Sequence, residues 1–395
     1  MCESATARWI GRRARLWEPG HRTGENVVIG KSLTLAGIAK SYGAVEAVKD
    51  TSLEIDAGEF VSIVGPSGSG KTSLLTMIAG FEPPSAGTIH IGQRDITLVA
   101  PNRRDIGMVF QRYALFPHMT VRRNIEFPLR MRGSACSVHG RQRVDEMLEL
   151  VQLTGLDDRY PHQLSGGQQQ RVAVARALVF NPPVILMDEP LGALDKKLRE
   201  AMQLEIKRIQ ERVGATVVYV THDQEEALTM SHRVAVMHRG ILQQIGAPDE
   251  LYLEPKNAFV ADFIGSINFL PVTVVSSDAT VIVVVMSGSA TPLRVKSQWS
   301  DAPAPGQALT LALRPEHLSV RPTQWDRDAV IEGVIESVVF VGATRTALVR
   351  LTAIGDKVVR VQVPFAAPLP AKGSLVCLEF SPGDARLFPS SEVVR

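Results

Sequence analysis

The stretch GPSGSGKT, residues 65–72, combines three glycines with a lysine and a threonine at a spacing that suits phosphate binding. It follows the apolar run FVSIV and precedes SLLTMIAG, so the pattern predicts a strand, a loop and then a helix. Glycines allow successive backbone N–H groups to turn inward, and the start of a helix adds its positive dipole end. We therefore expect Lys71 to bridge the β- and γ-phosphates of a nucleotide, and the Thr72 hydroxyl to hold Mg²⁺.

A second stretch, VILMDEP at 184–190, places two carboxylates at the end of an apolar strand. Burying both acids without a purpose would be costly. Phosphate chemistry gives each a role, with Asp188 in the Mg²⁺ shell and Glu189 as the general base for the attacking water. The alternative, in which both acids merely cap the next element, is much weaker beside a phosphate loop.

A third stretch, LSGGQQQR at 164–171, opens a predicted helix with a flexible Ser-Gly-Gly segment. Its backbone N–H groups and the Ser165 hydroxyl form another anion-binding helix start. Phosphates held at Lys71 already have a helix N-terminus of their own, so this second one must approach from the opposite side. A two-fold dimer would let each chain supply this motif to the nucleotide of the other, and we predict ATP between two copies of the chain.

The predicted elements divide the chain into two domains, as 395 residues with 45% hydrophobic composition would suggest. From about Leu33 to Gly265, strand-like runs alternate with helical periodicity, which is typical of α/β architecture. Strands are expected at 33–43, 47–55, 60–64, 88–91, 106–110, 184–188, 216–221 and 233–237.

From about Val272 onward, short alternating strands are broken by Gly, Pro and Ser, which predicts a small all-β barrel or sandwich. Expected strands there include 308–314, 330–340 and 346–351. We set the domain boundaries at 1–31 for a basic, disordered extension, 32–265 for the α/β domain and 266–395 for the β-rich domain.

The composition excludes several classes of protein. Lys and Arg number 43 against 41 Asp and Glu, so no global field favours nucleic acid, although the first 22 residues are locally basic. The three cysteines, Cys2, Cys136 and Cys377, have neither metal-ligand nor disulfide spacing, which fits a reducing cytoplasm. The longest apolar stretches fall short of a membrane span, so we expect the chain not to cross a bilayer by itself.

Taken together, the three motifs and their order resemble the ATPase cassette of ABC transporters over about 33–265. The resemblance assigns ATP contacts to Tyr42, which would stack on adenine, and to the loop residues Gly65, Pro66, Ser67, Gly68, Ser69, Gly70, Lys71, Thr72 and Ser73. In trans it assigns Ser165, Gly166, Gly167 and Gln168 of the signature, and Asp195 in LGALD.

The same resemblance implies catalytic roles for Lys71, Gln111, Glu189 and His222, and a Mg²⁺ site formed by Thr72, Gln111 and Asp188. Gln111 in VFQRYALFPHMTV looks like the glutamine that senses Mg²⁺ and water, and His222 in YVTHDQEEAL looks like the switch histidine at the γ-phosphate. One departure is Gly192, where many relatives carry serine. We expect activity to survive it because Asp195 is retained.

The resemblance further implies a peripheral motor subunit on the cytoplasmic face of the plasma membrane. Its partners would be a second copy of itself, two integral-membrane permease subunits and a periplasmic or extracellular solute-binding protein. The stretches INFLPVTV and LALRPEHLSV resemble the oligonucleotide-binding-like (TOBE) regulatory domain of importer ATPases. We expect no nucleic-acid partner, because this domain has neither an aromatic stacking platform nor a basic cluster in its sequence.

The chain most resembles polyamine (spermidine/putrescine) importers, but ferric-iron, thiamine, sulfate and glycerol-phosphate importers share nearly the same pattern. Two other classes stay open. A soluble ABC protein of translation or DNA repair usually carries two cassettes or a long coiled-coil insertion, and neither is visible here. A binding module with a degenerate cassette is disfavoured by the intact Lys71, Asp188, Glu189 and His222.

Overall fold

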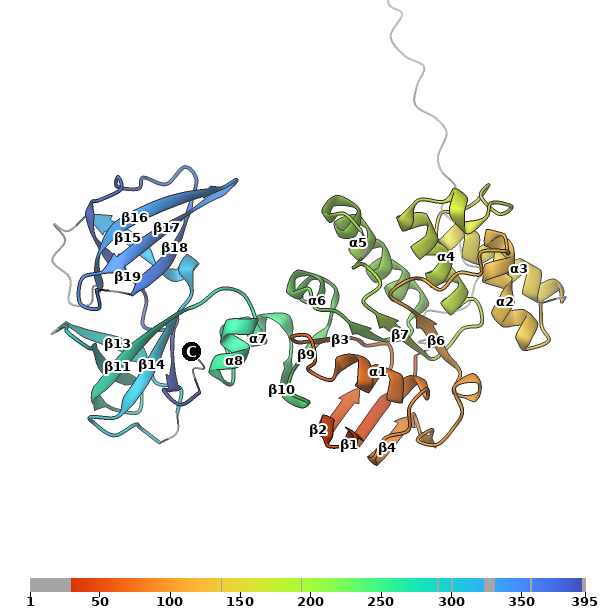
Figure 1. Ribbon diagram of the computed structural model, residues 1–395, viewed down its shortest axis with the longest axis horizontal. Coiled ribbons are helices and arrows are strands. Elements are labelled where there is room, and N and C mark those ends of the chain that lie inside the picture. Colours follow the sequence, from red (N-terminus) through yellow and green to blue (C-terminus); the bar gives the residue numbers. More distant parts are fainter. Residues whose placement is uncertain are drawn as a thin grey trace, which may run out of the picture.

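The computed structural model describes residues 30–135, 137–192, 194–289, 291–299, 301–322, 331–355 and 357–392. Most of the extension expected at 1–31, together with Cys2 and Cys136, lies outside the described residues. Cys377 is a free, buried cysteine. Figure 1 shows an α/β part joined through α7 and α8 to two sheets formed by the C-terminal third of the chain.

A six-stranded sheet forms the centre of the α/β part, with strands in the order β10-β9-β3-β8-β7-β6. Its strands are β3 (Phe60–Val64), β6 (Ile106–Val109), β7 (Val184–Asp188), β8 (Thr216–Val220), β9 (Arg233–His238) and β10 (Ile241–Gly246). All neighbours pair in parallel except β9 and β10. Every residue of β3 and β8 is buried, as expected for strands covered on both faces.

Side chains on the two faces of this sheet enter two different cores. On β7, Val184 and Leu186 face one core and Ile185 and Met187 the other, which follows from the two-residue period of a strand. The first core also contains α1 (Lys71–Ala79) and a four-stranded antiparallel sheet, β2-β1-β4-β5. Its strands are β1 (Leu33–Tyr42), β2 (Val45–Ile55), β4 (Ala86–Ile91) and β5 (Arg94–Asp95).

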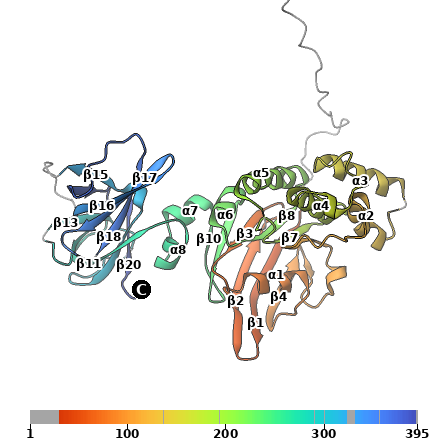
Figure 2. The same cartoon turned by 45° about the horizontal axis from the view of Figure 1, so that its top comes forward.

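The second core lies under a layer of helices. They are α2 (Val121–Met131), α3 (Val138–Leu150), α4 (Gly166–Leu178), α5 (Lys196–Val213) and α6 (Gln224–Met230), with short 3₁₀ turns η1 (Pro101–Arg103) and η2 (Pro161–Gln163) nearby in the chain. Figure 2 shows α2, α3 and α4 grouped at the end of the α/β part that lies away from the C-terminal sheets. The signature segment is therefore carried on a different layer from the phosphate loop.

Two five-stranded antiparallel sheets make up the C-terminal part, in the orders β13-β12-β11-β14-β20 and β15-β19-β16-β17-β18. Their strands are β11 (Asn268–Ser277), β12 (Val281–Met286), β13 (Pro292–Lys296), β14 (Ala308–Leu313), β15 (Ser319–Pro322), β16 (Ile331–Val341), β17 (Thr344–Leu351), β18 (Val358–Pro364), β19 (Leu375–Glu379) and β20 (Ala385–Pro389), with the 3₁₀ turn η3 (Pro315–His317). Both sheets contribute to one apolar core. Alternation of buried and partly exposed residues along β12 reflects that packing.

The junction between the two parts is formed by α7 (Pro248–Leu253) and α8 (Ala258–Phe263). Ala258 and Ala261 on α8 pack with Ala312 of β14 and Phe388 of β20. The small side chains on α8 bring its backbone close to the β-rich part, so the junction is a packed contact as well as a covalent linker.

The expected fold class is confirmed, including the strands read from the alternation of apolar residues. The expectation of no aromatic stacking platform in the β-rich domain stays a prediction, because the aromatic pair found there packs edge to face. Phe340 and Phe365 are exposed, and their ring centroids lie 5.4 Å apart. They are 25 positions apart in the sequence, so no local pattern linked them. In the described part of the chain, no helix is long and apolar enough to span a membrane.

Candidate nucleotide site

The phosphate loop connects β3 to α1, as the sequence predicted. Lys71 is the first residue of α1 and its ammonium is buried in the loop, where Nζ donates to the carbonyl oxygens of Gly65 at 2.7 Å and Pro66 at 3.0 Å. Burial lowers the pKa of Lys71, and the nearby carboxylates of Glu189 and Asp188 oppose that shift. The loop thus holds a positive charge within the electrostatic reach of both acids.

Two glycines of the loop are required by close approach of the backbone. A Cβ at Gly65 would lie 2.1 Å from the carbonyl oxygen of Met237, and one at Gly70 would lie 2.4 Å from that of Ala47. Gly70 also has φ of 99°, a conformation that side chains disfavour. Pro66, Ser67, Gly68 and Thr72 are exposed, Ser73 is half-buried, and Ser69 is buried.

Glu189 brings together three of the predicted catalytic residues. Nε2 of Gln111 donates to Oε2 of Glu189 at 2.9 Å, and Nδ1 of His222 lies 3.4 Å from Oε1. Glu189 follows β7 with φ of 41°, and its N–H donates to the carbonyl of Val220 at 2.9 Å. A non-glycine residue in this region is strained, and such strain is common where a side chain must be aimed.

The two acids at the end of β7 are half-buried rather than fully buried as the sequence suggested, whereas the four residues before them are buried. Burial raises the pKa of Asp188, the charge of Glu189 raises it further, and Lys71 opposes both. Access to solvent leaves both carboxylates able to meet a ligand.

The residues predicted to hold Mg²⁺ offer only oxygen donors: the Thr72 hydroxyl, the Asp188 carboxylate and the Gln111 amide. Gln111 uses its amide nitrogen toward Glu189, and its amide oxygen accepts no hydrogen bond from the described residues. Mg²⁺ prefers such hard oxygen ligands, few of them from protein, with waters and phosphates completing the shell. The donor set therefore fits the ion.

The signature segment is a well-capped helix start. Ser165 Oγ accepts from the N–H of Gln168 at 3.3 Å, and Gln168 Oε1 accepts from the N–H of Ser165 at 3.0 Å. Ser165 and Gly166 are exposed, while Gly167 is buried close to Leu198 of α5. Among the described residues, no hydrogen bond joins this segment to the phosphate loop.

Asp195 caps α5, since its Oδ1 accepts from the N–H of Leu198 at 3.0 Å. Tyr42 ends β1 with 45% of its surface exposed, and the Lys40 ammonium lies 4.9 Å from its ring centroid. At Gly192, a Cβ would lie 3.6 Å from the carbonyl oxygen of Glu189, an ordinary contact. The departure from serine at this position therefore has no steric cause.

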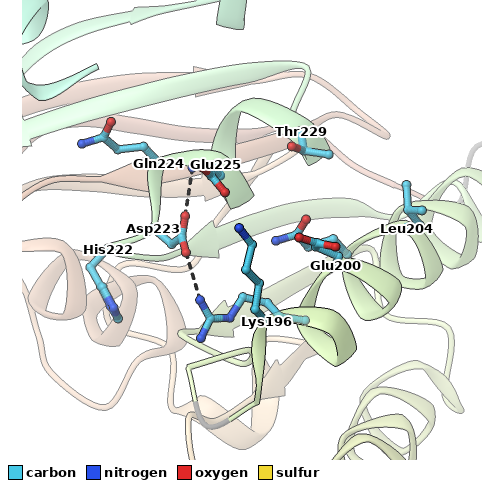
Figure 3. A pocket seen from close by; sticks show the side chains of 10 residues that line it. Lys196, Glu200, Leu204, His222, Asp223, Gln224, Glu225 and Thr229 are labelled. Atoms are coloured by element: carbon cyan, nitrogen blue, oxygen red, sulfur yellow. Dashed lines mark hydrogen bonds and ion pairs between the residues drawn. The ribbon is translucent and has the colours of Figure 1, made fainter. Parts of the chain in front are cut away.

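Sequence reasoning missed a polar link beside His222. A pocket of about 750 Å³ opens between α5 and α6, with Lys196 and Glu200 on one side and Asp223 on the other (Figure 3). Arg199 donates to Asp223 Oδ2 at 3.1 Å and to the carbonyl of Leu194 at 3.0 Å. Arg199 thereby links Asp223, which follows His222, to Leu194, which precedes Asp195. The sequence could not predict this link, because a bond to a backbone carbonyl does not depend on the type of residue that carries it.

Comparison with known proteins agrees with this geometry. Residues 48–192 match the ABC transporter family, and residues 311–388 match the TOBE domain family. A spermidine/putrescine import ATP-binding protein PotA from Chromobacterium violaceum is 52% identical over 73% of this chain and 79% of its own length. One from Thermobifida fusca is 46% identical over 91% of this chain and 94% of its own length.

A solved structure, the dimeric ATP-binding cassette MJ0796 bound to ADP and Pi, aligns with 55% of this chain and 98% of its own, at 38% identity and a TM-score of 0.49.

Lys71 follows β3, and the paired carboxylates Asp188 and Glu189 stand at the end of β7, two strands away in the same sheet. A buried lysine and paired acids in this arrangement define a nucleotide hydrolase of the P-loop class. Given relatives this similar over most of its length, the chain belongs to the ATP-binding subunits of ABC importers, with a cassette followed by a TOBE domain. It is an ATPase whose activity is coupled to transport.

Proposed function

We propose that this chain hydrolyses ATP to drive the uptake of a polyamine, spermidine or putrescine, through a separate permease. The catalytic part of the proposal rests on one observation, the contact of Glu189 with both Gln111 and His222. The cargo is supported by relatives named as spermidine/putrescine import proteins in several organisms. Ferric iron, thiamine, sulfate and glycerol-phosphate are the alternative cargoes.

Lys71 would neutralise the phosphates. In the proposed mechanism its ammonium exchanges the carbonyls of Gly65 and Pro66 for oxygens of the β- and γ-phosphates. The loop N–H groups and the start of α1 add donors around the same anion. Tyr42 would stack on adenine, for which its exposed ring is available.

Glu189 would act as the general base. Its carboxylate takes a proton from the water that attacks the γ-phosphate, while the Gln111 amide fixes the orientation of that carboxylate. His222 would contact the γ-phosphate from the other side of Glu189. Mg²⁺ would be held by Thr72, Asp188 and the amide oxygen of Gln111, and when bound it supplies positive charge to the phosphate oxygens.

The site is completed by a second copy of the chain. Ser165, Gly166, Gly167, Gln168 and Asp195 would act in trans on the nucleotide held at Lys71 of the partner. The exposed, capped helix start at Ser165 supports this role, because it presents N–H groups to solvent and, among the described residues, has no hydrogen bond to the phosphate loop of its own chain.

The subunit would work at the cytoplasmic face of the plasma membrane. It would drive two integral-membrane permease subunits that receive cargo from a periplasmic or extracellular binding protein. We propose domain boundaries at 32–265 for the cassette and 266–395 for the TOBE domain. The gap between α8, which ends at Phe263, and β11, which begins at Asn268, supports the second boundary.

Transport by the assembled system tests the proposal. The chain is expressed with the permease and binding-protein genes that neighbour it, in cells lacking their own polyamine import, and uptake of labelled spermidine, putrescine, ferric iron, thiamine, sulfate and glycerol-phosphate is compared. Polyamine uptake is expected, and Glu189→Gln, which keeps the shape of the side chain, should abolish it. Uptake of another solute instead would show that the proposed assignment of polyamine as the cargo is wrong. Association with ribosomes or DNA ends, without any membrane partner, would favour a soluble ABC ATPase.

A further inference from the structure

Arg176, near the end of α4, is a buried cation that the proposed mechanism does not use. Only 8% of its surface is exposed. Its Nη2 donates to the carbonyl of Tyr113 and its Nη1 to the carbonyl of Ala114, both at 2.7 Å. Among the described residues no carboxylate pairs with it; its partners are the two backbone carbonyls and the ring of Phe116, whose centroid lies 5.5 Å from the guanidinium carbon. Burial lowers the pKa of Arg176, which is the electrostatic cost of placing it there.

The backbone that Arg176 holds is strained. Tyr113 and Ala114 have φ of 57° and 46°, so two consecutive non-glycine residues occupy the left-handed region. The N–H of Ala114 donates to the carbonyl of Arg112 at 2.6 Å, which makes the turn tight. Such conformations persist only when the surroundings enforce them. The fork of the Arg176 guanidinium, with one donor for each carbonyl, provides that enforcement.

The strained turn lies directly beside the catalytic constellation. Gln111 precedes Tyr113 by two residues and donates to Glu189 at 2.9 Å. The N–H of Tyr113 donates to the carbonyl of Phe110 at 2.9 Å, so Gln111 is enclosed within this turn. A relaxation of Tyr113 and Ala114 to negative φ would therefore redirect the Gln111 side chain.

The same helix begins at the signature. α4 runs from Gly166 to Leu178 with Ser165 as its cap, so Ser165 and Arg176 lie about 16 Å apart on one rigid element. Displacement of the helix start must move the guanidinium, and with it the carbonyls of the Gln111 turn.

We propose that Arg176 is a positioning residue for Gln111, which holds the strained turn at 113–114 and transmits displacement of the signature helix to the Gln111–Glu189 contact. This inference rests on the proposed role of Gln111 in turnover. It adds a mechanical link from the segment that meets the partner's nucleotide to the glutamine that serves the chain's own nucleotide.

Steady-state ATPase kinetics of the full-length protein, alone and with its permease, test the link. Arg176→Met is expected to lower kcat by roughly tenfold or more with KM for ATP within about threefold, because the loop and Lys71 are untouched. Arg176→Lys, which keeps the charge but lacks the fork, should fall between Arg176→Met and the parent. Arg143→Met is the control, since Arg143 of α3 also donates to a backbone carbonyl, that of Val179 at 3.3 Å, outside the Gln111 turn; its kcat should be unchanged.

Glycine at position 114 distinguishes positioning from general stability. Glycine adopts positive φ without strain, so Ala114→Gly in the Arg176→Met background should recover part of kcat when both variants are assayed well below their unfolding temperatures. A double variant no more active than Arg176→Met would overturn the proposal, as would unchanged kcat in Arg176→Met.

A second route avoids the buried arginine in case Arg176→Met does not fold. Ala114 is exposed, so Ala114→Val adds strain at φ of 46° without disturbing a core. It should lower kcat, whereas Ala114→Gly alone should not, and unchanged kcat in Ala114→Val would contradict the proposal. Gln111→Ala separates the two hypotheses. If Gln111→Ala retains full ATPase activity, the proposed role of Gln111 is wrong. If Gln111→Ala is inactive while Arg176→Met is fully active, only the link through Arg176 is rejected.

Discussion

Arg314 of the β-rich domain stacks on Tyr252 of α7, with its guanidinium carbon 3.6 Å from the ring centroid. Nη2 of Arg314 donates to the carbonyl of Tyr252 at 2.7 Å, and Nη1 donates to the carbonyl of Ile264 at 2.8 Å. Burial lowers the pKa of Arg314 to about 10, so the group stays cationic at neutral pH. One side chain of the TOBE domain thus satisfies carbonyls at the ends of both junction helices.

Replacing Arg314 by Met should loosen the junction. The change leaves the part-buried carbonyl of Tyr252 and the buried carbonyl of Ile264 without their Arg314 donors, and we expect a loss of about 2–4 kcal/mol of unfolding free energy. Urea unfolding measures this loss, and limited proteolysis between α8 and β11 should become faster. Arg386→Met is the control, because among the described residues Arg386 makes a single hydrogen bond across the same junction, from Nε to the carbonyl of Leu253 at 3.0 Å. Equal losses in the two variants would contradict the special role of Arg314.

The phosphate loop offers a test of close backbone approach. Gly70→Ala places a Cβ 2.4 Å from the carbonyl oxygen of Ala47 at φ of 99°, whereas Gly68→Ala has φ of 76° and open space around the new atom. Both substitutions cost strain, but only the first also forces the loop away from β2. We expect about 1 kcal/mol of destabilisation for Gly68→Ala and about 3 kcal/mol for Gly70→Ala, measured by thermal unfolding without nucleotide. Similar unfolding temperatures of Gly70→Ala and Gly68→Ala would show that the loop can move away from β2 at little energetic cost.

Glu59 and Arg233 form a two-point ion pair, with Oε1 to Nε at 2.6 Å and Oε2 to Nη2 at 2.8 Å. Burial alone would raise the pKa of Glu59, but the bonds from Arg233 and from the N–H of Asp56 outweigh burial and hold it below the ordinary value of 4.5. A carboxyl whose pKa is lowered by folding stabilises the fold above its unfolded pKa. That stabilisation is lost as pH falls through the lower, folded pKa.

Glu59→Gln should therefore cost about 1–2 kcal/mol of unfolding free energy at pH 7, and its difference from the parent should narrow as pH falls below about 4.5. Denaturant unfolding across this pH range measures the effect. Glu54→Gln is the control, since the hydrogen bond of Arg233 to Glu54 goes to the backbone carbonyl and the charge of the Glu54 carboxylate has a smaller effect on Arg233 than that of Glu59. If the difference in unfolding free energy between Glu59→Gln and the parent stayed constant with pH, the ion pair would contribute nothing to that difference.

Most of the fold could be predicted from local patterns in the sequence. The run FVSIV and its glycine-rich continuation predicted the strand, loop and helix that hold Lys71, because each feature depends on neighbours in sequence. The β-rich domain was visible from period-two alternation for the same reason.

Contacts to backbone carbonyls could not be predicted. Arg176 stands in the otherwise apolar run VAVARALV, which hints at a buried cation, but its partners at 113 and 114 carry no side-chain signal. Arg314 in LALRPEHL is the same case. The meeting of Gln111, Glu189 and His222 depends on sheet order, which brings segments 78 and 33 residues apart to one edge; only the family resemblance suggested it in advance.

Heterodimers test whether nucleotide sites are shared between chains. In a purified heterodimer of Ser165→Arg and Lys71→Ala subunits, a shared arrangement puts both lesions into one site and leaves the other intact. About half of the parental ATPase activity is then expected, whereas each homodimer should be inactive. If each chain instead formed its own complete site, the same heterodimer would contain no intact site.

The heterodimer of parent and Ser165→Arg subunits calibrates this comparison, because it has one intact site under either arrangement. If turnover at one site depends on the other site, the activity of this calibrating heterodimer falls by as much as the activity of the Ser165→Arg/Lys71→Ala heterodimer. Sharing requires the two heterodimers to be equally active. An active calibrating pair beside an inactive Ser165→Arg/Lys71→Ala pair would place Ser165 and Lys71 of one chain at the same nucleotide and reject the two-chain site.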